Sequence, residues 1–111
     1  MKTYLTIILF FLTFLAKTQT CGAGGIMLSS QDEINDFATD YPGCTSILGS
    51  LSISGSDIND LSPLSVLTSI GGSLEIYGNI NLYNITGLNN LSGPITGNIR
   101  FSNNGITNFT G

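Results

Sequence analysis

LSISG at residues 51–55 recurs as LEIYG at residues 74–78 and as IRFSN at residues 99–103. The first residues of the three segments are 23 and 25 positions apart. Apolar residues hold the first and third places of each segment, and mostly polar residues hold the others. This period of two is typical of a β-strand with one buried face. The segments therefore predict short β-strands that recur once per repeat.

Apolar residues between these segments keep the same phase. The repeating columns are Ile58, Leu82 and Ile106; Leu61, Ile85 and Phe109; Leu64 and Leu88; Leu67 and Leu91; and Ile70 and Ile95. One repeat is too short to bury a core alone, whereas stacked repeats align each column into a shared interior. Because equivalent segments run in the same direction, we expect their strands to pair in parallel, about 4.8 Å apart. The sequence therefore predicts a mainly β solenoid over residues 45–111.

Polar residues also recur at equivalent places after the strands. Asn79 and Asn104 form one pair, and Asp60, Asn84 and Asn108 form a second column. Stacked amides can hydrogen-bond one another and the backbone groups of the corners, which would otherwise be left unsatisfied. The sequence leaves open the alternative that these are ordinary solvent-exposed loop asparagines.

A short amphipathic helix is expected at about residues 30–41, ahead of the repeats. Ser30 and Glu33 have the spacing of a capping box, in which each side chain satisfies an unpaired backbone donor of the first turn. The apolar stripe that follows consists of Ile34, Phe37, Ala38 and Tyr41. Terminal units of solenoids usually carry a cap. We therefore assign residues 21–44 to an N-terminal cap.

The first twenty residues have the outline of a secretory signal peptide. Lys2 precedes an apolar run over residues 4–16, and the chain turns polar at Lys17. A membrane-spanning helix needs roughly 20 apolar residues, and a mature membrane anchor is the alternative. We expect a secreted or cell-surface protein, which meets a membrane only through this signal peptide or a segment beyond Gly111.

The two cysteines, Cys21 and Cys44, are expected to form a disulfide. Export places them in an oxidising compartment, where a disulfide is favoured over free thiols. The bridge would pin the segment before the helix to the start of the first repeat. Two cysteines in a chain without histidine do not favour a metal site.

The chain lacks the side chains of most catalytic and cofactor sites. The absence of histidine excludes Ser-His-Asp, Cys-His and histidine-metal arrangements. Asp57 and Asp60 fall short of the roughly six to eight oxygen ligands that calcium takes. The glycine-rich residues 22–25 lack the lysine of a phosphate loop. We therefore expect no enzyme, no catalytic residue, no cofactor and no metal.

The charge of the chain argues against nucleic acid as a partner. Its formal net charge is −4, and only Lys2, Lys17 and Arg100 are basic. Two of these residues leave with the signal peptide. A chain with a single remaining positive charge does not neutralise a phosphate backbone.

If the strands alternate as predicted, one sheet face presents two outward columns. Ser52, Glu75 and Arg100 form the first column, and Ser54, Tyr77 and Ser102 form the second. We predict this face for recognition, because a solenoid offers an extended sheet surface built from successive rungs. An ordinary solvated face is the alternative.

Three asparagines begin Asn-x-Ser/Thr glycosylation patterns. They are Asn84, Asn90 and Asn108. Their middle residues include Ile85 and Phe109, which the repeat pattern places in the core. This favours repeat spacing over modification as the origin of the patterns.

Several stretches resemble the receptor L domain of the insulin and epidermal-growth-factor receptors and of exported leucine-rich-repeat proteins. They are Cys21, the helix at 31–41, YPGCT at 41–45, LSPLSVLTSIGG at 61–72 and GLNNL at 87–91. The resemblance covers residues 21–111 and implies a right-handed parallel β-helix with helical capping and a role in binding. The chain departs from the family in its few turns and in lacking cysteine-rich modules. No ligand-contacting residue carries over.

The sequence thus favours a non-catalytic recognition module that binds an unknown protein or glycan. One alternative is the N-terminal stalk of a larger exported enzyme. A second is an ice- or surface-binding solenoid, which would need a flat Thr-rich column in place of Glu75, Tyr77 and Arg100. Since the repeats break off midway at Gly111 without a cap, we expect a chain truncated at its C-terminus.

Overall fold

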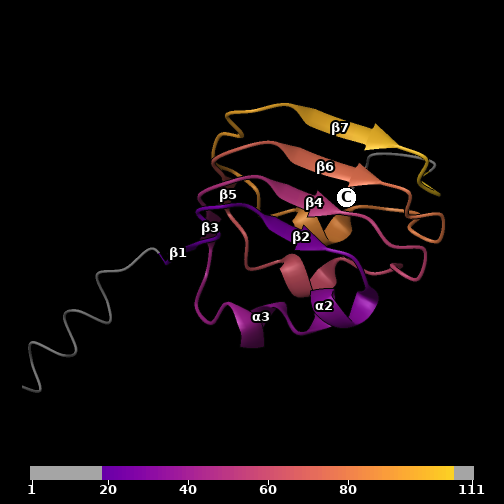
Figure 1. Cartoon of the computed structure of the whole chain (residues 1–111), viewed down its shortest axis with the longest axis horizontal. Coiled ribbons are helices and arrows are strands. Elements are labelled where there is room, and N and C mark those ends of the chain that lie inside the picture. Colours follow the sequence, from indigo (N-terminus) through magenta and orange to yellow (C-terminus); the bar gives the residue numbers. More distant parts are fainter. Residues whose placement is uncertain (1–18, 107–111) are drawn as a thin grey trace, which may run out of the picture.

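Two parallel β-sheets hold successive repeats of the chain side by side (Figure 1). The computed structural model describes residues 19–106, so that the predicted signal peptide falls almost wholly outside the described residues, as do Asn108 and Phe109. The short sheet has the order β1 (Thr20–Cys21), β3 (Ser46–Ile47), β5 (Ser69–Ile70). The long sheet has the order β2 (Ile26–Leu28), β4 (Leu51–Ile53), β6 (Leu74–Tyr77), β7 (Ile99–Ser102).

The register of the long sheet confirms the predicted rungs. Leu51 pairs with Leu74, and Leu74 pairs with Ile99, in parallel. Each strand therefore lies beside its equivalent from the next repeat, as Figure 1 shows for β2, β4, β6 and β7. Ile70 and Ile95 form a further parallel bridge next to the short sheet. We call each passage of the chain through both sheets and back a coil.

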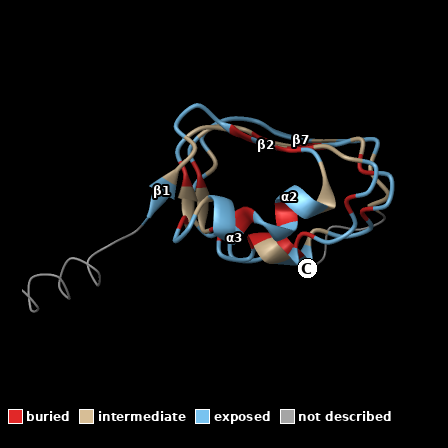
Figure 2. Ribbon diagram, turned by 60° about the horizontal axis from the view of Figure 1, so that its bottom comes forward, coloured by how far each residue is buried: buried red, intermediate tan, exposed pale blue. Residues whose placement is uncertain are grey.

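In the first three coils, helical segments lie on the part of the coil that is not in either sheet. In the first coil these are α2 (Gln31–Asn35) and α3 (Phe37–Asp40), and in the next two they are the 3-10 helices η1 (Ser62–Leu64) and η2 (Thr86–Leu88). Both α2 and α3 contact η1, and η1 contacts η2. Figure 2 shows the coils nearly end-on, with the sheets and the helical side enclosing the interior.

The helix expected over residues 30–41 is interrupted. It divides at Asp36, which has φ −88° and ψ 3° and caps both α2 and α3. Asn and Asp favour caps over helix interiors because their side chains compete for backbone hydrogen bonds. The division leaves Ile34 and Phe37 fully buried, whereas Ala38, expected in the same stripe, is exposed.

The predicted capping box forms only in part. Ser30 is the N-cap, and its hydroxyl accepts a hydrogen bond from the Glu33 backbone N–H at 3.2 Å. The Glu33 carboxylate, however, accepts from the Ser29 backbone N–H at 2.9 Å and not from that of Ser30. Asp57 of the next coil accepts from the Gln31 backbone N–H, so the start of α2 is also capped from the second coil.

The apolar columns fill the interior of the coils. Leu51, Ile53, Ile58, Leu64, Leu67, Ile70 and Ile76 have no exposed surface. In Figure 2 buried stretches recur on the sheets and on the helical segments. Ile99 was expected to be buried in the same column as Leu51 and Leu74, yet this residue is 54% exposed. The reason is that β7 pairs with β6 on one side, and no described strand lies on its other side.

Of the two predicted polar columns, the pair Asn79 and Asn104 stacks as expected. Asp60 and Asn84 of the other column do not stack: both are exposed, and each accepts from the backbone N–H two residues on, that of Ser62 and that of Thr86. Asn79 is fully buried, and its Oδ1 accepts from the Gly55 backbone N–H at 2.8 Å. Its Nδ2 donates to the Ile53 carbonyl at 3.0 Å and to Asn104 Oδ1 at 2.9 Å. Asn104 repeats the pattern one coil later, accepting from the Asn79 backbone N–H. The stack therefore satisfies corner groups that water does not reach.

A column of glycines forms the corner between the two sheets. The backbone N–H of Gly49 donates to Gly22, that of Gly72 to Gly49 and that of Gly97 to Gly72, each at 2.9 Å. A Cβ atom at Gly72 would lie 2.7 Å from the Ser50 backbone nitrogen. The backbones of successive coils therefore lie so close at this corner that there is no room for a Cβ atom.

The glycine corner yields a stability prediction. Gly72→Ala should lower the free energy of unfolding by about 1–3 kcal/mol, because the Cβ forces backbone apart. Gly24→Ala is the matched control, since no atom lies within 4 Å of its Cβ position. The control should change stability by less than about 0.5 kcal/mol. Urea denaturation of both variants measures the difference, and equal stabilities would contradict the close approach.

Candidate binding face

Five of the six residues predicted for recognition lie in strands of the long sheet, and the sixth, Ser54, directly follows β4. Ser52 pairs with Glu75 and Glu75 with Arg100, while Tyr77 pairs with Ser102. The strand alternation places these side chains opposite the buried ones. Met27 of β2 extends the first column by one rung and is 67% exposed. Sequence reasoning missed Met27 because the first repeat differs from the others.

The first column is tied together by its own side chains. Arg100 Nη1 donates to Glu75 Oε2 at 3.0 Å, and Ser52 Oγ donates to Glu75 Oε1 at 3.2 Å. The predicted ion pair between Glu75 and Arg100 is thus present. The Arg100 side chain is 68% exposed, so the pair contributes little stability. The positive charge of Arg100 balances the negative charge of Glu75, so the first column carries no net charge.

The remaining acidic side chains gather away from this face. They lie on the helical segments and the second-coil corner: Asp32, Glu33, Asp36, Asp40, Asp57 and Asp60. Asp60 Oδ1 accepts from the Ser62 backbone N–H at 2.9 Å. The backbone N–H of Ser62, and then its hydroxyl, lower the pKa of Asp60 below the ordinary 3.8. The carboxylate therefore accepts from the first residue of η1, and this contribution is lost only as the pH falls through that lowered pKa.

The acidic corner does not assemble a metal site in the described part of the chain. Among residues 19–106, no group of three or more Asp, Glu, Cys or His side chains is placed to hold a metal ion. Asp57 and Asp60, which the sequence analysis considered for calcium, each accept a backbone hydrogen bond. Their geometry is explained by helix capping.

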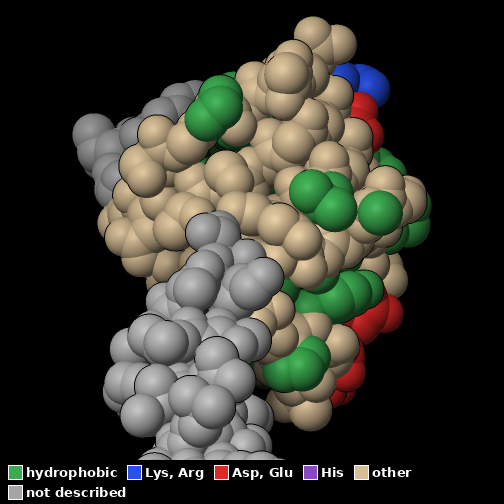
Figure 3. All heavy atoms as spheres, turned by 90° about the vertical axis from the view of Figure 1, so that its left-hand side faces the viewer, with side chains coloured by type: hydrophobic (Ala, Val, Ile, Leu, Met, Phe, Trp, Pro, Cys, Tyr) green, Lys and Arg blue, Asp and Glu red, His purple; other side chains and the backbone are tan. Residues whose placement is uncertain are grey.

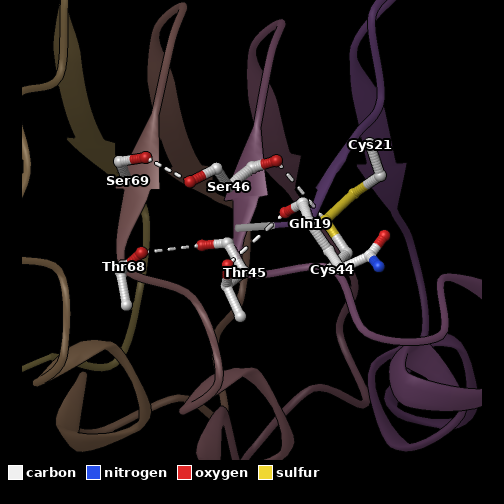
Figure 4. Close-up of a disulfide and its surroundings, with 7 residues drawn as sticks. All are labelled: Gln19, Cys21, Cys44, Thr45, Ser46, Thr68 and Ser69. Atoms are coloured by element: carbon white, nitrogen blue, oxygen red, sulfur yellow. Dashed lines mark hydrogen bonds between the residues drawn. A yellow bond between two sulfur atoms is a disulfide. The ribbon is translucent and has the colours of Figure 1, made fainter. Parts of the chain in front are cut away.

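A disulfide joins the first two coils, as predicted. Cys21 of β1 and Cys44, just before β3, have Cα atoms 5.8 Å apart and are bonded (Figure 4). Beside the bridge, the Gln19 carbonyl accepts from the backbone N–H groups of Thr45 and Ser46. The disulfide therefore fastens the first strand of the short sheet to the second.

Hydroxyl side chains line the short sheet, and they bond to their neighbours. Ser46 Oγ and Ser69 Oγ are 2.7 Å apart, and Thr68 Oγ1 donates to the Thr45 carbonyl at 3.0 Å (Figure 4). Figure 3 looks onto this side of the molecule and shows scattered hydrophobic side chains among uncharged ones, with charged side chains along the right-hand edge of the view. These hydroxyls bond adjacent coils to each other, so their role in the structure is to stabilise the stack of coils.

A second exposed set lies in the third coil, at and after the end of β6. Tyr77 is 40% exposed, Ile80 61% and Tyr83 58%. We call these three residues the coil-three strip. Sequence reasoning identified Tyr77 but missed Ile80 and Tyr83. The available signal was their contrast with Ser56 and Asn59, the equivalent residues one repeat earlier.

Two of the three glycosylation patterns lie within the described residues, and they differ. Asn84 is exposed, and its Oδ1 accepts from the Thr86 hydroxyl at 2.8 Å. Its Nδ2 donates no hydrogen bond to any residue in 19–106. Asn90 Nδ2, by contrast, donates to the Ser65 carbonyl of the preceding coil. That these patterns arise from repeat spacing and not from modification stays a prediction for Asn84, whereas the amide of Asn90 has a structural use.

A small hollow lies at the β2 edge of the face. It holds about 250 Å³ and is lined by Gly24, Gly25, Ile26, Met27, Ser50 and Ser52. Pockets for drug-sized ligands span roughly 300–1,000 Å³ and enclose most of the ligand. The hollow is smaller and open, so this face suits surface recognition better than an enclosed small molecule. Over residues 19–106 there is also no helix long and apolar enough to cross a membrane.

Parallel coils, an N-terminal helical segment and a disulfide across the first coils define a repeat module with a mainly β core. The family model described as Receptor L domain matches residues 43–107, more than half of the chain. The chain therefore belongs to the receptor L domain family. Members of this family are non-catalytic, ligand-binding modules of extracellular proteins. No curated protein and no solved structure matches the chain.

The disulfide yields the second prediction. Replacing both cysteines, Cys21→Ser with Cys44→Ser, should lower the free energy of unfolding by about 3 kcal/mol, because the unfolded chain regains the entropy of the open loop. Urea denaturation with and without a thiol reductant measures this. The reductant should destabilise the wild type and leave the double variant unchanged. A wild type that is insensitive to reduction would contradict a structural role for the bridge.

Proposed function

We propose that this chain is a secreted or cell-surface recognition module that binds its ligand on the outer face of the long sheet. The observation that carries the proposal is the parallel register of Ser52, Glu75 and Arg100 beside that of Tyr77 and Ser102. It presents side chains from several coils on one rigid surface. Rigid elements hold binding groups more accurately than loops do.

The chemistry of the face favours binding over catalysis. Its one carboxylate, Glu75, accepts hydrogen bonds on both oxygens from Ser52 and Arg100. Acid/base catalysis needs a side chain that is free to exchange a proton with a substrate. A carboxylate held by an arginine and a serine instead orients its neighbours. The face is therefore proposed as a non-catalytic surface.

We further propose a right-handed coil for the stack and an exported chain whose residues 1–20 are a signal peptide. Parallel strands joined by a crossover are right-handed in nearly all proteins, which supports the first proposal. The Cys21–Cys44 disulfide supports the second, because such bridges persist in oxidising compartments. Residues 21–44 would then begin the mature protein as its cap, followed by the repeats.

Binding of the labelled protein to intact cells tests this function. A multivalent form of the wild type should bind a cell surface, and Tyr77→Ser combined with Arg100→Ser should reduce binding by about tenfold or more, since tyrosine and arginine dominate binding surfaces. The matched control is Leu48→Ser, which removes a 54% exposed side chain next to the short sheet. It should bind as the wild type does. Equal loss in both variants, or no binding by the wild type to any cell tested, would overturn the proposal.

A further inference from the structure

Asn104 and Gly105 form the one Asn-Gly sequence in the chain. Asparagine followed by glycine is chemically labile, because glycine has no Cβ atom to hinder the attack of its backbone nitrogen on the preceding side chain. The other asparagines are followed by larger residues, and Asn79, at the equivalent corner one coil earlier, is followed by the β-branched Ile80. The reaction is therefore expected at one corner, directly after β7.

The fold requires both residues of this pair. Asn104 Oδ1 accepts from the backbone N–H and from Nδ2 of Asn79, at 3.1 and 2.9 Å, and its own Nδ2 donates to the Ile76 carbonyl at 2.7 Å. A Cβ atom at Gly105 would lie 2.6 Å from the Ile80 carbonyl oxygen. A larger residue after Asn104 would therefore push the coils apart, so the stack of coils brings a labile sequence with it.

The reaction of this pair is intramolecular. The backbone nitrogen of Gly105 loses its proton and attacks Cγ of Asn104; the N–Cγ bond forms, the Cγ–Nδ2 bond breaks, and the leaving nitrogen takes up a proton to depart as ammonia. Water then opens the cyclic imide at either carbonyl, which leaves aspartate or isoaspartate in place of the asparagine. Water is the only co-reactant, and the step needs no oxidant, reductant or cofactor.

In the folded protein both reacting groups are already bonded elsewhere. The backbone N–H of Gly105 donates to the Asn79 carbonyl at 3.1 Å, and this bond holds the proton that the nitrogen must lose. The bonds of the Asn104 amide to Asn79 and Ile76 fix the group whose carbon must turn onto that nitrogen. Asn104 and Gly105 are also half-buried. Ring closure therefore requires this corner to open first, through a local opening that costs at most the free energy of global unfolding.

We propose that Asn104 is a deamidation site that the asparagine stack protects, and that its modification destabilises the corner. An aspartate still accepts from Asn79, yet it has no N–H to donate to the Ile76 carbonyl, and two oxygens then face each other. Isoaspartate also lengthens the backbone by a methylene group where Gly105 already lies against the preceding coil. A chain whose corner has opened therefore keeps a chemical mark after it refolds. The inference goes beyond the proposed recognition function and does not depend on a ligand.

The test compares two Asn-Gly sequences in one chain. Ala23→Asn creates a second one before Gly24, where both residues are exposed and no described atom lies within 4 Å of the Gly24 Cβ position. This variant is incubated folded and in unfolding urea at one pH and temperature, and peptide mapping by mass spectrometry follows deamidation at both positions. In the folded protein Asn104 should react at least about tenfold more slowly than position 23, which corresponds to an opening free energy of at least about 1.4 kcal/mol. In urea the two rates should become similar.

The effect of the modification is tested with Asn104→Asp. This variant should lower the melting temperature by about 4–8 °C, the shift expected from one lost hydrogen bond in a domain of this size. Asn103→Asp is the matched control, because it adds the same charge at the neighbouring, exposed residue. The control should keep the melting temperature of the wild type.

Each outcome decides one part of the proposal. Equal rates at positions 23 and 104 in the folded protein overturn the protection by the stack. An Asn104 that stays unmodified in urea, while position 23 reacts, overturns its assignment as a deamidation site. Equal melting temperatures of Asn104→Asp and Asn103→Asp overturn the effect on the corner. All three results leave the proposed recognition function as it stands, because the binding face is not changed.

Discussion

Every coil of this protein depends on its neighbours for its hydrogen bonds and its core. Asn79 shows the constraint most clearly, since it is fully buried and bonds the corner of the preceding coil and Asn104 of the following one. A buried amide without partners is costly. The positions of the backbone corners are therefore fixed relative to one another. Once they are fixed, the strands fall into register and the leucine and isoleucine columns meet inside.

The same constraint explains the outer surface. Because the register aligns equivalent residues on adjacent rungs, outward side chains form straight columns with a constant spacing. Glu75 meets Arg100 for this reason, although the two are far apart in sequence. Tyr77 is paired with the small Ser102 and keeps 40% of its surface exposed. The surface proposed for recognition is thus a consequence of the stack and not a separate structure built upon it.

The repeat pattern predicted the parallel rungs, the asparagine stack, the disulfide and the Glu75–Arg100 pair. These features follow from residues that recur in phase, or from there being only two cysteines to join. The outward position of the recognition residues followed from alternation alone. Whether a ligand uses them depends on chemistry outside the chain.

Other features depend on distances between coils, which the repeat pattern does not encode. The glycine corner was missed because glycine is common here and its spacing is uneven, so only the close approach of Gly49, Gly72 and Gly97 to the preceding coil distinguishes it. The division of the helix at Asp36 was missed because Ile34 and Phe37 keep the spacing of one continuous helix face and are both buried. The exposure of Ile99 reflects its place at the edge of the described sheet, and periodicity treats all rungs alike. Tyr83 was missed because its equivalent positions hold different residues.

The central claim is that equivalent aliphatic side chains of successive coils lie against one another inside one shared interior. Nuclear Overhauser measurements between selectively labelled methyl groups test it most directly. The account predicts cross-peaks joining Leu51 to Leu74 and Ile53 to Ile76, because these residues are paired and buried on adjacent rungs. Well-resolved methyl signals from a folded protein with no cross-peaks between these pairs would contradict it.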